Sequence, residues 1–418
     1  MQRIALFITF GLLCQLSLAQ DMLRVKEIVT DLSSPAYYGR GYVNKGDSLA
    51  ADYIARALKK RRIKPIENNY FQRFRMGINR YTDTPQLKID GKVLSNGIDW
   101  VPYPTSPTVH GTFPVIWITQ KDLIQKKAFR QLCQQDLANS FITFDTCVVN
   151  NKELYRLARN LFTSGPYLAK GIVDAVESPK FSARRYVCDY VTLRVRREHW
   201  TREVKEIEVD LDHAFIEDYT SQNVMGFIPG KSDTCITLIG HYDHLGMFGE
   251  VMYPGANDNA SGVAMMLELG DYFKKHKPRY SIQLIFFGAE EAGFFGSTHY
   301  VAHPVYPLEK TKMVINFDMV ASGTKWTELI QATLYPSVEE TFVKINSKNN
   351  YIKHLKPTGY EASSDHINFH DKGIPAIFFW TAGGNEFYHE PGDLPDSISY
   401  PVFEGIYKLV CDFVETYQ

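Results

Sequence analysis

The sequence predicts an α/β protein: a three-layer, mostly parallel but mixed sheet with helices on both faces, plus an inserted, β-rich smaller lobe. After about residue 215, short apolar runs alternate with helical segments, which is typical of a largely parallel sheet covered on both faces. The middle of the chain alternates with period two instead. With 418 residues, the chain also exceeds what one hydrophobic core usually serves.

The first residues predict a signal peptide, residues 1–19. Arg3 provides a basic start, residues 4–14 are almost entirely apolar, and residues 17–19 offer the small side chains that a signal peptidase reads. The apolar run is shorter than the roughly 20 residues needed to cross a bilayer. We therefore expect cleavage after Ala19 and export to the periplasm or the extracellular space, with no membrane association afterwards.

Apolar positions recur at helical spacing from Ser48 to Lys60, which predicts an amphipathic helix. Residues 20–77, which contain it, are expected to be the N-terminal part of the main domain, as the family resemblance given below implies. Residues 78–214 are expected to form a separate unit, called the inserted lobe below. Its alternating segments 191–196 and 206–211 predict a hairpin or two neighbouring strands.

Residues 215–418 are expected to form the larger part of the main domain. Their apolar runs and helical patterns follow the order strand, helix, strand, helix, strand, with a closing helix: 236–240, 261–274, 282–287, 294–303, 313–317 and 401–416. In such sheets, ligands bind just beyond the carboxyl ends of the strands.

Charge and cysteine content limit the class of protein. With 46 Lys and Arg against 47 Asp and Glu, the chain has no excess of positive charge to neutralise nucleic acid. Removal of the signal peptide leaves five cysteines, so at least one is unpaired within the chain. Cys235 and Cys411 are expected to be buried thiols, while Cys133, Cys147 and Cys188 offer one bridge.

Acids and histidines gather at the predicted strand ends. Taken singly, each is more often a structural group than a functional one. Together they are expected to meet at one edge of the sheet, where adjacent carboxylates repel unless a cation holds them. Nitrogen and carboxylate ligands without thiolates favour zinc, and also suit cobalt or manganese. The segments are 240–244, 255–259, 288–291, 316–318 and 387–393.

These motifs resemble the co-catalytic di-zinc exopeptidase family that contains secreted bacterial aminopeptidases, glutamate carboxypeptidases, transferrin-receptor-type domains and glutaminyl cyclases. The resemblance covers residues 215–418 and, more loosely, 30–65 around Gly39–Gly41. It implies a zinc peptidase catalytic domain in residues 215–418. It also implies that the inserted lobe corresponds in position to a protease-associated insertion, although no sequence match supports that.

The resemblance also implies a role for each residue. One zinc ion would be held by His241, Asp258 and Asp318, and the second by Asp258, Glu291 and His389, with Asp258 shared between the two. Asp243 would orient His241. Glu290 would be the general base, a task that needs a carboxylate close to the metal but not tied to it.

Several activities occur on this scaffold, so the residues must separate them. The complete ligand set and base favour an enzyme over a receptor-like binding domain, and two metals over the single zinc of a cyclase. The acid-rich, arginine-poor surroundings favour an aminopeptidase acting on peptides over a carboxypeptidase.

Four weaker candidates remain. His244 is expected to be a neighbour of the ligands, Asp393 to serve local turn chemistry, and Met247, Phe248, Met252 and Tyr253 to pack under their loop. For Asp365 and His366, a place in the substrate site and a structural hydrogen bond are equally supported.

Overall fold

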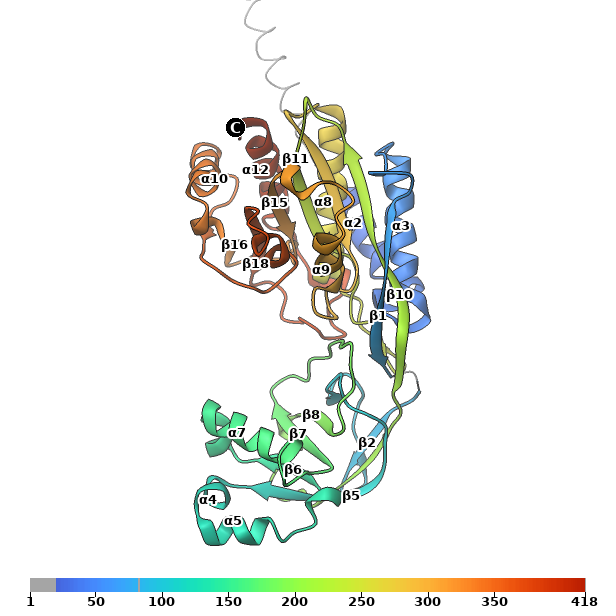
Figure 1. Ribbon diagram of the computed structural model, residues 1–418, viewed down its shortest axis with the longest axis vertical. Coiled ribbons are helices and arrows are strands. Elements are labelled where there is room, and N and C mark those ends of the chain that lie inside the picture. Colours follow the sequence, from blue (N-terminus) through green and yellow to red (C-terminus); the bar gives the residue numbers. More distant parts are fainter. Residues whose placement is uncertain (1–19, 82, 418) are drawn as a thin grey trace, which may run out of the picture.

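The computed structural model describes residues 20–81 and 83–417, so the predicted signal peptide lies outside the described residues. The described chain forms two sheets of eight strands and a two-stranded ribbon, β12 (Met247–Phe248) and β13 (Val251–Met252). Figure 1 shows the first sheet and its helices in the upper half and the second sheet below them. No helix among the described residues is long and apolar enough to cross a membrane.

The first sheet is mixed, with a parallel centre. Neighbouring strands β14, β11, β15 and β18 run parallel, and antiparallel neighbours flank them on both sides. Because Ile239 pairs with both Ile285 and Asn316, the carboxyl ends of the central strands lie side by side. In spatial order the strands are β1 (Phe71–Arg80), β10 (Ala214–Ile228), β14 (Tyr280–Phe287), β11 (Ser232–His241), β15 (Thr311–Phe317), β18 (Ala376–Ala382), β16 (Trp326–Ile330) and β17 (Leu355–Pro357).

Helices cover both faces of this sheet, which confirms the three-layer prediction. The larger core packs one face against α2 (Met22–Leu32), α3 (Gly46–Lys60), α8 (Ser261–Lys275), α10 (Pro336–Asn349) and α12 (Phe403–Thr416). The other face packs against the shorter α9 (Phe295–Ala302) and α11 (His366–His370).

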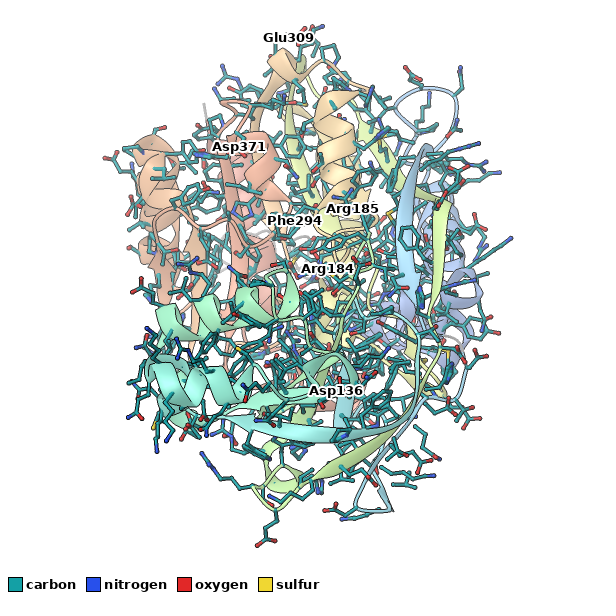
Figure 2. All side chains as sticks on the ribbon, turned by 60° about the horizontal axis from the view of Figure 1, so that its bottom comes forward. Asp136, Arg184, Arg185, Phe294, Glu309 and Asp371 are labelled. Atoms are coloured by element: carbon teal, nitrogen blue, oxygen red, sulfur yellow. The ribbon has the colours of Figure 1, made fainter. Side chains whose placement is uncertain are left out.

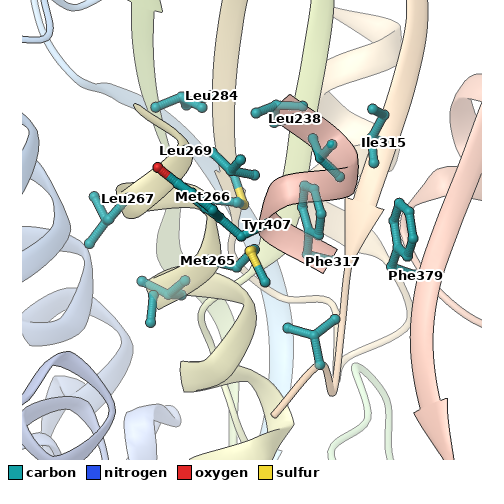
Figure 3. Packing of buried hydrophobic residues seen from close by; sticks show 14 of the residues in the cluster. Leu238, Met265, Met266, Leu267, Leu269, Leu284, Ile315, Phe317, Phe379 and Tyr407 are labelled. Atoms are coloured by element: carbon teal, nitrogen blue, oxygen red, sulfur yellow. The ribbon is translucent and has the colours of Figure 1, made fainter. Parts of the chain in front are cut away.

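Helix α8 is buried on almost all sides because it lies between the sheet and the outer helices. Figure 3 shows its side chains against residues of the strands and of α12: Met265, Met266, Leu267 and Leu269 with Leu238, Leu284, Ile315, Phe317, Phe379 and Tyr407. Each such burial stabilises the fold by roughly 1.5–3 kcal/mol. This packing fixes the start of α8, which follows directly on the loop that carries Asp258.

The inserted lobe contains the second sheet. It leaves the first sheet after Arg80 and returns at Ala214, two residues that are paired between β1 and β10. The order of its strands is β3 (Lys92–Val93), β2 (Gln86–Ile89), β9 (Glu206–Leu211), β5 (Val109–Ile118), β6 (Phe141–Phe144), β7 (Gly171–Val176), β8 (Val191–Arg196) and β4 (Trp100–Pro102). Its helices are α4 (Gln120–Ile124), α5 (Lys126–Leu132), α6 (Thr146–Asn150) and α7 (Lys152–Thr163).

Two local expectations are corrected. Strands β8 and β9 exist but are not neighbours, because β8 pairs with β7 and β4 whereas β9 pairs with β2 and β5. The five cysteines of the described residues are all free, so no bridge joins Cys133, Cys147 and Cys188. Cys235 and Cys411 are buried, as predicted.

Candidate active site

The site lies where the central strands end. Strand β11 ends at His241, the turn after β14 carries Glu290 and Glu291, and Asp318 follows β15 directly. Asp258 comes from the loop before α8, and His389 from the loop after β18. These side chains are buried except for that of His389, which is half-buried.

Asp258 joins two groups of side chains. Its Oδ1 lies 3.3 Å from Nε2 of His241, which is also 3.3 Å from Oδ1 of Asp318. Its Oδ2 lies 3.3 Å from Nε2 of His389, which is 3.2 Å from Oε2 of Glu291. The structure thus brings together the five residues predicted as ligands, in the two predicted sets, with one carboxylate between them.

His244 is fully buried behind this cluster. Its Nδ1 lies 2.9 Å from Oε1 of Glu291 and 3.8 Å from Oδ2 of Asp258. His389 lies closer to Asp258 and, unlike His244, lines the adjoining cavities.

Glu290 differs from its neighbour. Its carboxylate comes within 4.8 Å of the ligand atoms of His241 and Asp318, yet it forms no ion pair with the cationic groups of the described residues, whereas Glu291 contacts two histidines. Of the adjacent acids, one therefore contacts the histidines and the other stays free.

The side chain of Asp243 contacts the backbone of the acidic pair Glu290–Glu291, while its backbone carbonyl contacts His241. Its carboxylate accepts hydrogen bonds from the backbone N–H groups of Glu290 (3.1 Å) and Glu291 (3.3 Å) and from the Tyr42 hydroxyl (2.9 Å). The Nδ1 atom of His241 is 3.0 Å from the backbone carbonyl of Asp243 but 3.8 Å from its carboxylate. The orienting contact expected from the side chain is thus made by the carbonyl.

The pKa values reflect a dense cluster of opposite charges. Although burial opposes it, the imidazoles lower the pKa of Asp258 well below its usual value and that of Glu291 to about 2. Burial raises the pKa of Glu290 well above its usual value, and the neighbouring carboxylates raise it further. Burial and the neighbouring carboxylates thus favour the protonated form of Glu290.

Two residues hold the loop that carries Asp258. Both carboxylate oxygens of Asp393 accept hydrogen bonds from the backbone of Asn257, and one also accepts from the Asp258 N–H at 3.0 Å. The expectation of purely local turn chemistry for Asp393 is therefore wrong. Arg40, which is fully buried, donates to the carbonyl oxygens of Gly255 and Asp258, among others.

Two cavities meet at the site carboxylates. One, of about 500 Å³, is called the acid-lined cavity because Glu328 and Glu361 line it in addition to the site residues. It also contains the apolar side chains Ile330, Phe378 and Trp380. Sequence reasoning missed these residues because none of them belongs to a motif.

The second cavity, of about 460 Å³, is called the cation-lined cavity because Lys180, Arg184 and Arg194 of the inserted lobe line it. Glu290, Glu291, Ser363, Tyr388 and His389 line both cavities. A further cavity of about 590 Å³ lies within the lobe itself and contains none of the site carboxylates.

The inserted lobe contacts the site directly. The carbonyl of Phe181 lies 3.1 Å from Nδ1 of His389, and the Phe181 N–H donates to the His389 carbonyl at 3.3 Å. The lobe thereby fixes the imidazole ring so that Nε2 points toward Asp258.

The weaker candidates have structural contacts. Asp365 accepts a hydrogen bond from Ser297, and His366 Nε2 donates to the carbonyl of Glu361. Neither side chain lines the two cavities. Phe248 and Tyr253 are fully buried in a core shared with the lobe, which agrees with packing under their loop.

Two histidines and two further carboxylates around one shared acid form a candidate dinuclear metal centre of a hydrolase. Residues 223–414 match the model of peptidase family M28.

Two curated relatives that match part of this chain are described as aminopeptidases, and a solved structure shares its fold. Aminopeptidase YwaD of Bacillus subtilis is 31% identical over 49% of this chain and 46% of its own, and probable leucine aminopeptidase 2 of Aspergillus oryzae is 32% identical over 48% and 45%. In these matches the chain spans about half the length of the curated relatives. The zinc aminopeptidase BSAP of Bacillus subtilis shares the fold over 96% of this chain and 97% of its own, with a TM-score of 0.69 and 21% identity.

Proposed function

We propose that the chain is a zinc-dependent aminopeptidase that hydrolyses the N-terminal peptide bond of peptides. The observation that carries this proposal is the position of Asp258, whose two oxygens face different histidines, each with a further acid beside it. A carboxylate shared in this way suits two cations held close together. Relatives described as aminopeptidases support the same reaction.

The donor set fits zinc. Imidazole nitrogens and carboxylate oxygens are the available donors, and no cysteine of residues 20–81 and 83–417 lines the acid-lined cavity. One ion would be held by His241, Asp258 and Asp318, and the other by Asp258, Glu291 and His389. When bound, the ions supply Lewis acidity that lowers the pKa of water and polarises the scissile carbonyl.

Glu290 is proposed as the general base. It accepts the proton of the attacking water at its carboxylate and delivers it to the departing amine. It forms no ion pair within the described part of the chain and lies where both cavities meet, and these two observations support this role. Asp243 holds the backbone of Glu290 and Glu291, and we propose that it keeps the base and the ligand in their different orientations.

The acid-lined cavity is proposed to receive the N-terminal residue of the substrate. Glu361 offers a carboxylate to a free ammonium group, as does Glu328, whose Oε1 also contacts Lys356 at 3.1 Å. No lysine or arginine lines this cavity among the described residues. Ile330, Phe378 and Trp380 offer an apolar wall to the side chain. This combination favours aminopeptidase action over carboxypeptidase action at this end of the site.

We further propose that the protein is exported after removal of residues 1–19. Catalysis would belong to residues 20–77 and 215–418, and the inserted lobe would cover the site.

The test compares the mature wild-type protein with Glu290→Gln and with the matched control Glu309→Gln. Glu309 is exposed and lies at the end of the molecule far from the lobe (Figure 2). We expect all three to bind about two zinc ions, as a shared-carboxylate site requires. The wild type and the control should cleave unblocked but not N-acetylated leucine anilide, and Glu290→Gln should lose a factor of about 10²–10⁴.

Absence of bound metal, or full activity of Glu290→Gln, would refute the mechanism. One bound metal without hydrolysis would instead favour a glutaminyl-cyclase-like enzyme, and metal binding without turnover of either kind would favour a receptor-like domain.

A further inference from the structure

Three cations of the inserted lobe surround the cation-lined cavity. Lys180 and Arg184 lie in the segment between β7 and β8, and Arg194 lies on β8. Phe294, which follows the acidic pair Glu290–Glu291 by a few residues, lines the same cavity. Figure 2 shows Arg184 and Phe294 in the middle of the molecule, where lobe and main domain meet.

None of these cations has an acidic partner among the described residues. The ion pairs of the described chain, defined by N–O distances up to 4.0 Å, include neither Lys180 nor Arg184 nor Arg194. Arg184 donates to the carbonyl of Ala183 at 2.8 Å, and Arg194 to that of Lys180 at 2.9 Å. Other lobe cations are paired; Arg159, for example, contacts Asp174 at 2.8 Å.

Two of the cations also lie near aromatic rings, which carry no negative charge. Arg194 lies 4.8 Å from the ring centre of Tyr103, and Lys180 lies 4.9 Å from that of Tyr388. Burial lowers the pKa of Arg194, and the charges of Arg159 and Arg184 lower it further, although Tyr103 and Asp174 oppose the shift. Half-buried cations that repel one another are costly unless an anion joins them.

The positions of the two cavities determine the orientation in which a peptide substrate would bind. An N-terminal residue in the acid-lined cavity places the scissile bond at Glu290 and Glu291, which line both cavities. The residues after the scissile bond then enter the cation-lined cavity. Its volume of about 460 Å³ is in the range of small-ligand pockets, roughly 300–1,000 Å³, and suits a short piece of peptide.

We propose that Arg184 and Arg194, with Lys180, bind the C-terminal carboxylate of the substrate, so that the preferred substrates are short peptides with both termini free. This inference rests on the proposed aminopeptidase function and adds the class of substrate. Guanidinium groups bind carboxylates through paired N–H donors, which makes arginine well suited to this task.

The test compares leucyl-alanine with leucyl-alanine amide on the metal-loaded enzyme. We expect kcat/KM to be about 10–100-fold higher for the free acid, since a hydrogen-bonded ion pair contributes this much to binding. Arg184→Gln should lose about tenfold on the acid and leave the amide unchanged, which also establishes that the variant is folded. Arg184→Lys, which keeps the charge, should retain part of the preference.

The matched control is Arg185→Gln. Arg185 donates to the carbonyl of Ala292, lies over the ring of Phe295, and does not line the cavity. It should keep the wild-type ratio of acid to amide.

Equal rates on acid and amide in the wild type, or an equal loss on both in Arg184→Gln, would overturn the inference while leaving the aminopeptidase proposal standing. Leucyl-aspartate amide tests a side-chain carboxylate as the anion; hydrolysis as fast as that of leucyl-alanine would assign the cations to an acidic side chain and overturn the C-terminal assignment. Failure of the wild type on every substrate, including leucine anilide, would refute the proposed function and this inference with it.

Discussion

Replacement of Arg40 by methionine tests how the loop that carries Asp258 is held. The guanidinium group is fully buried and uses all its donors on backbone carbonyls at 2.6–3.0 Å. The acceptors belong to segments far apart in the sequence: Leu32, Tyr242, Pro254, Gly255 and Asp258. Methionine fills much of the same volume but donates no hydrogen bond.

The expected loss of stability follows from the orphaned carbonyls. A buried carbonyl left without a donor costs about 1–3 kcal/mol. Four of the five acceptor carbonyls would lose their donor, since the Gly255 carbonyl also accepts from the Ala260 N–H at 3.3 Å. Taking the lower figure for each, since water and relaxation recover part of the cost, gives a loss of about 4 kcal/mol. A typical domain has only about 5–15 kcal/mol to lose. The zinc affinity should also fall, by about 10–100-fold, as is usual when a group supporting metal ligands is removed.

The assay is urea unfolding of wild type, Arg40→Met and Arg40→Lys in a chelator, so that metal binding does not contribute, followed by zinc titration. Lysine retains the charge and up to three donors and should recover part of the loss. An Arg40→Met protein within about 1 kcal/mol of wild type, a value typical of unremarkable substitutions, would show that the carbonyls are satisfied without the guanidinium and refute the reasoning.

Three further predictions concern stability. Burial raises the pKa of Asp47 to about 6 from its ordinary 3.8, so the folded state binds the proton of this carboxyl more tightly than the unfolded state does. The free energy of unfolding should therefore fall by about 3 kcal/mol as pH rises from about 4 to 6 and then level off. Measured in a chelator, Asp47→Asn should lack that fall, and parallel pH profiles of variant and wild type would contradict the shift. Addition of a chelator should lower the Tm and zinc should restore it, with about 4 kcal/mol gained at a zinc concentration 1,000 times Kd; a Tm indifferent to zinc would argue against a structured metal site. Phe413→Ala should cost about 3–5 kcal/mol in denaturant unfolding, because the ring stacks on Phe342 at 3.8 Å in the core, and a loss below about 1 kcal/mol would mean that the core closes over the gap.

The site residues that lie at the ends of predicted strands could be predicted from the sequence. Residues such as His241 and Asp318 follow apolar runs directly, so the predicted sheet already placed them at one edge. Glu328 and Arg184 could not be found in this way, because a charged residue in a strand or loop looks the same whether it faces solvent or a cavity.

Strand pairing within the inserted lobe was not predictable either. The alternation at β8 and β9 identifies two strands, but the alternation is local and the choice of partner is not. Strand β8 pairs in parallel with β7 and antiparallel with β4, which is distant in the sequence. Nor could the sequence reveal the contact of Phe181 with His389, since a backbone carbonyl is present at every residue.

That contact also bears on how such proteins can diverge. The lobe contacts His389 through main-chain atoms of Phe181. Substitutions in the lobe can therefore accumulate without breaking these hydrogen bonds, as long as the path of the backbone near Phe181 is kept. The family match begins only at residue 223, whereas the shared fold with BSAP extends over 96% of the chain. Around Phe181, shape can thus outlast sequence, because His389 is held there by a peptide bond and not by a particular side chain.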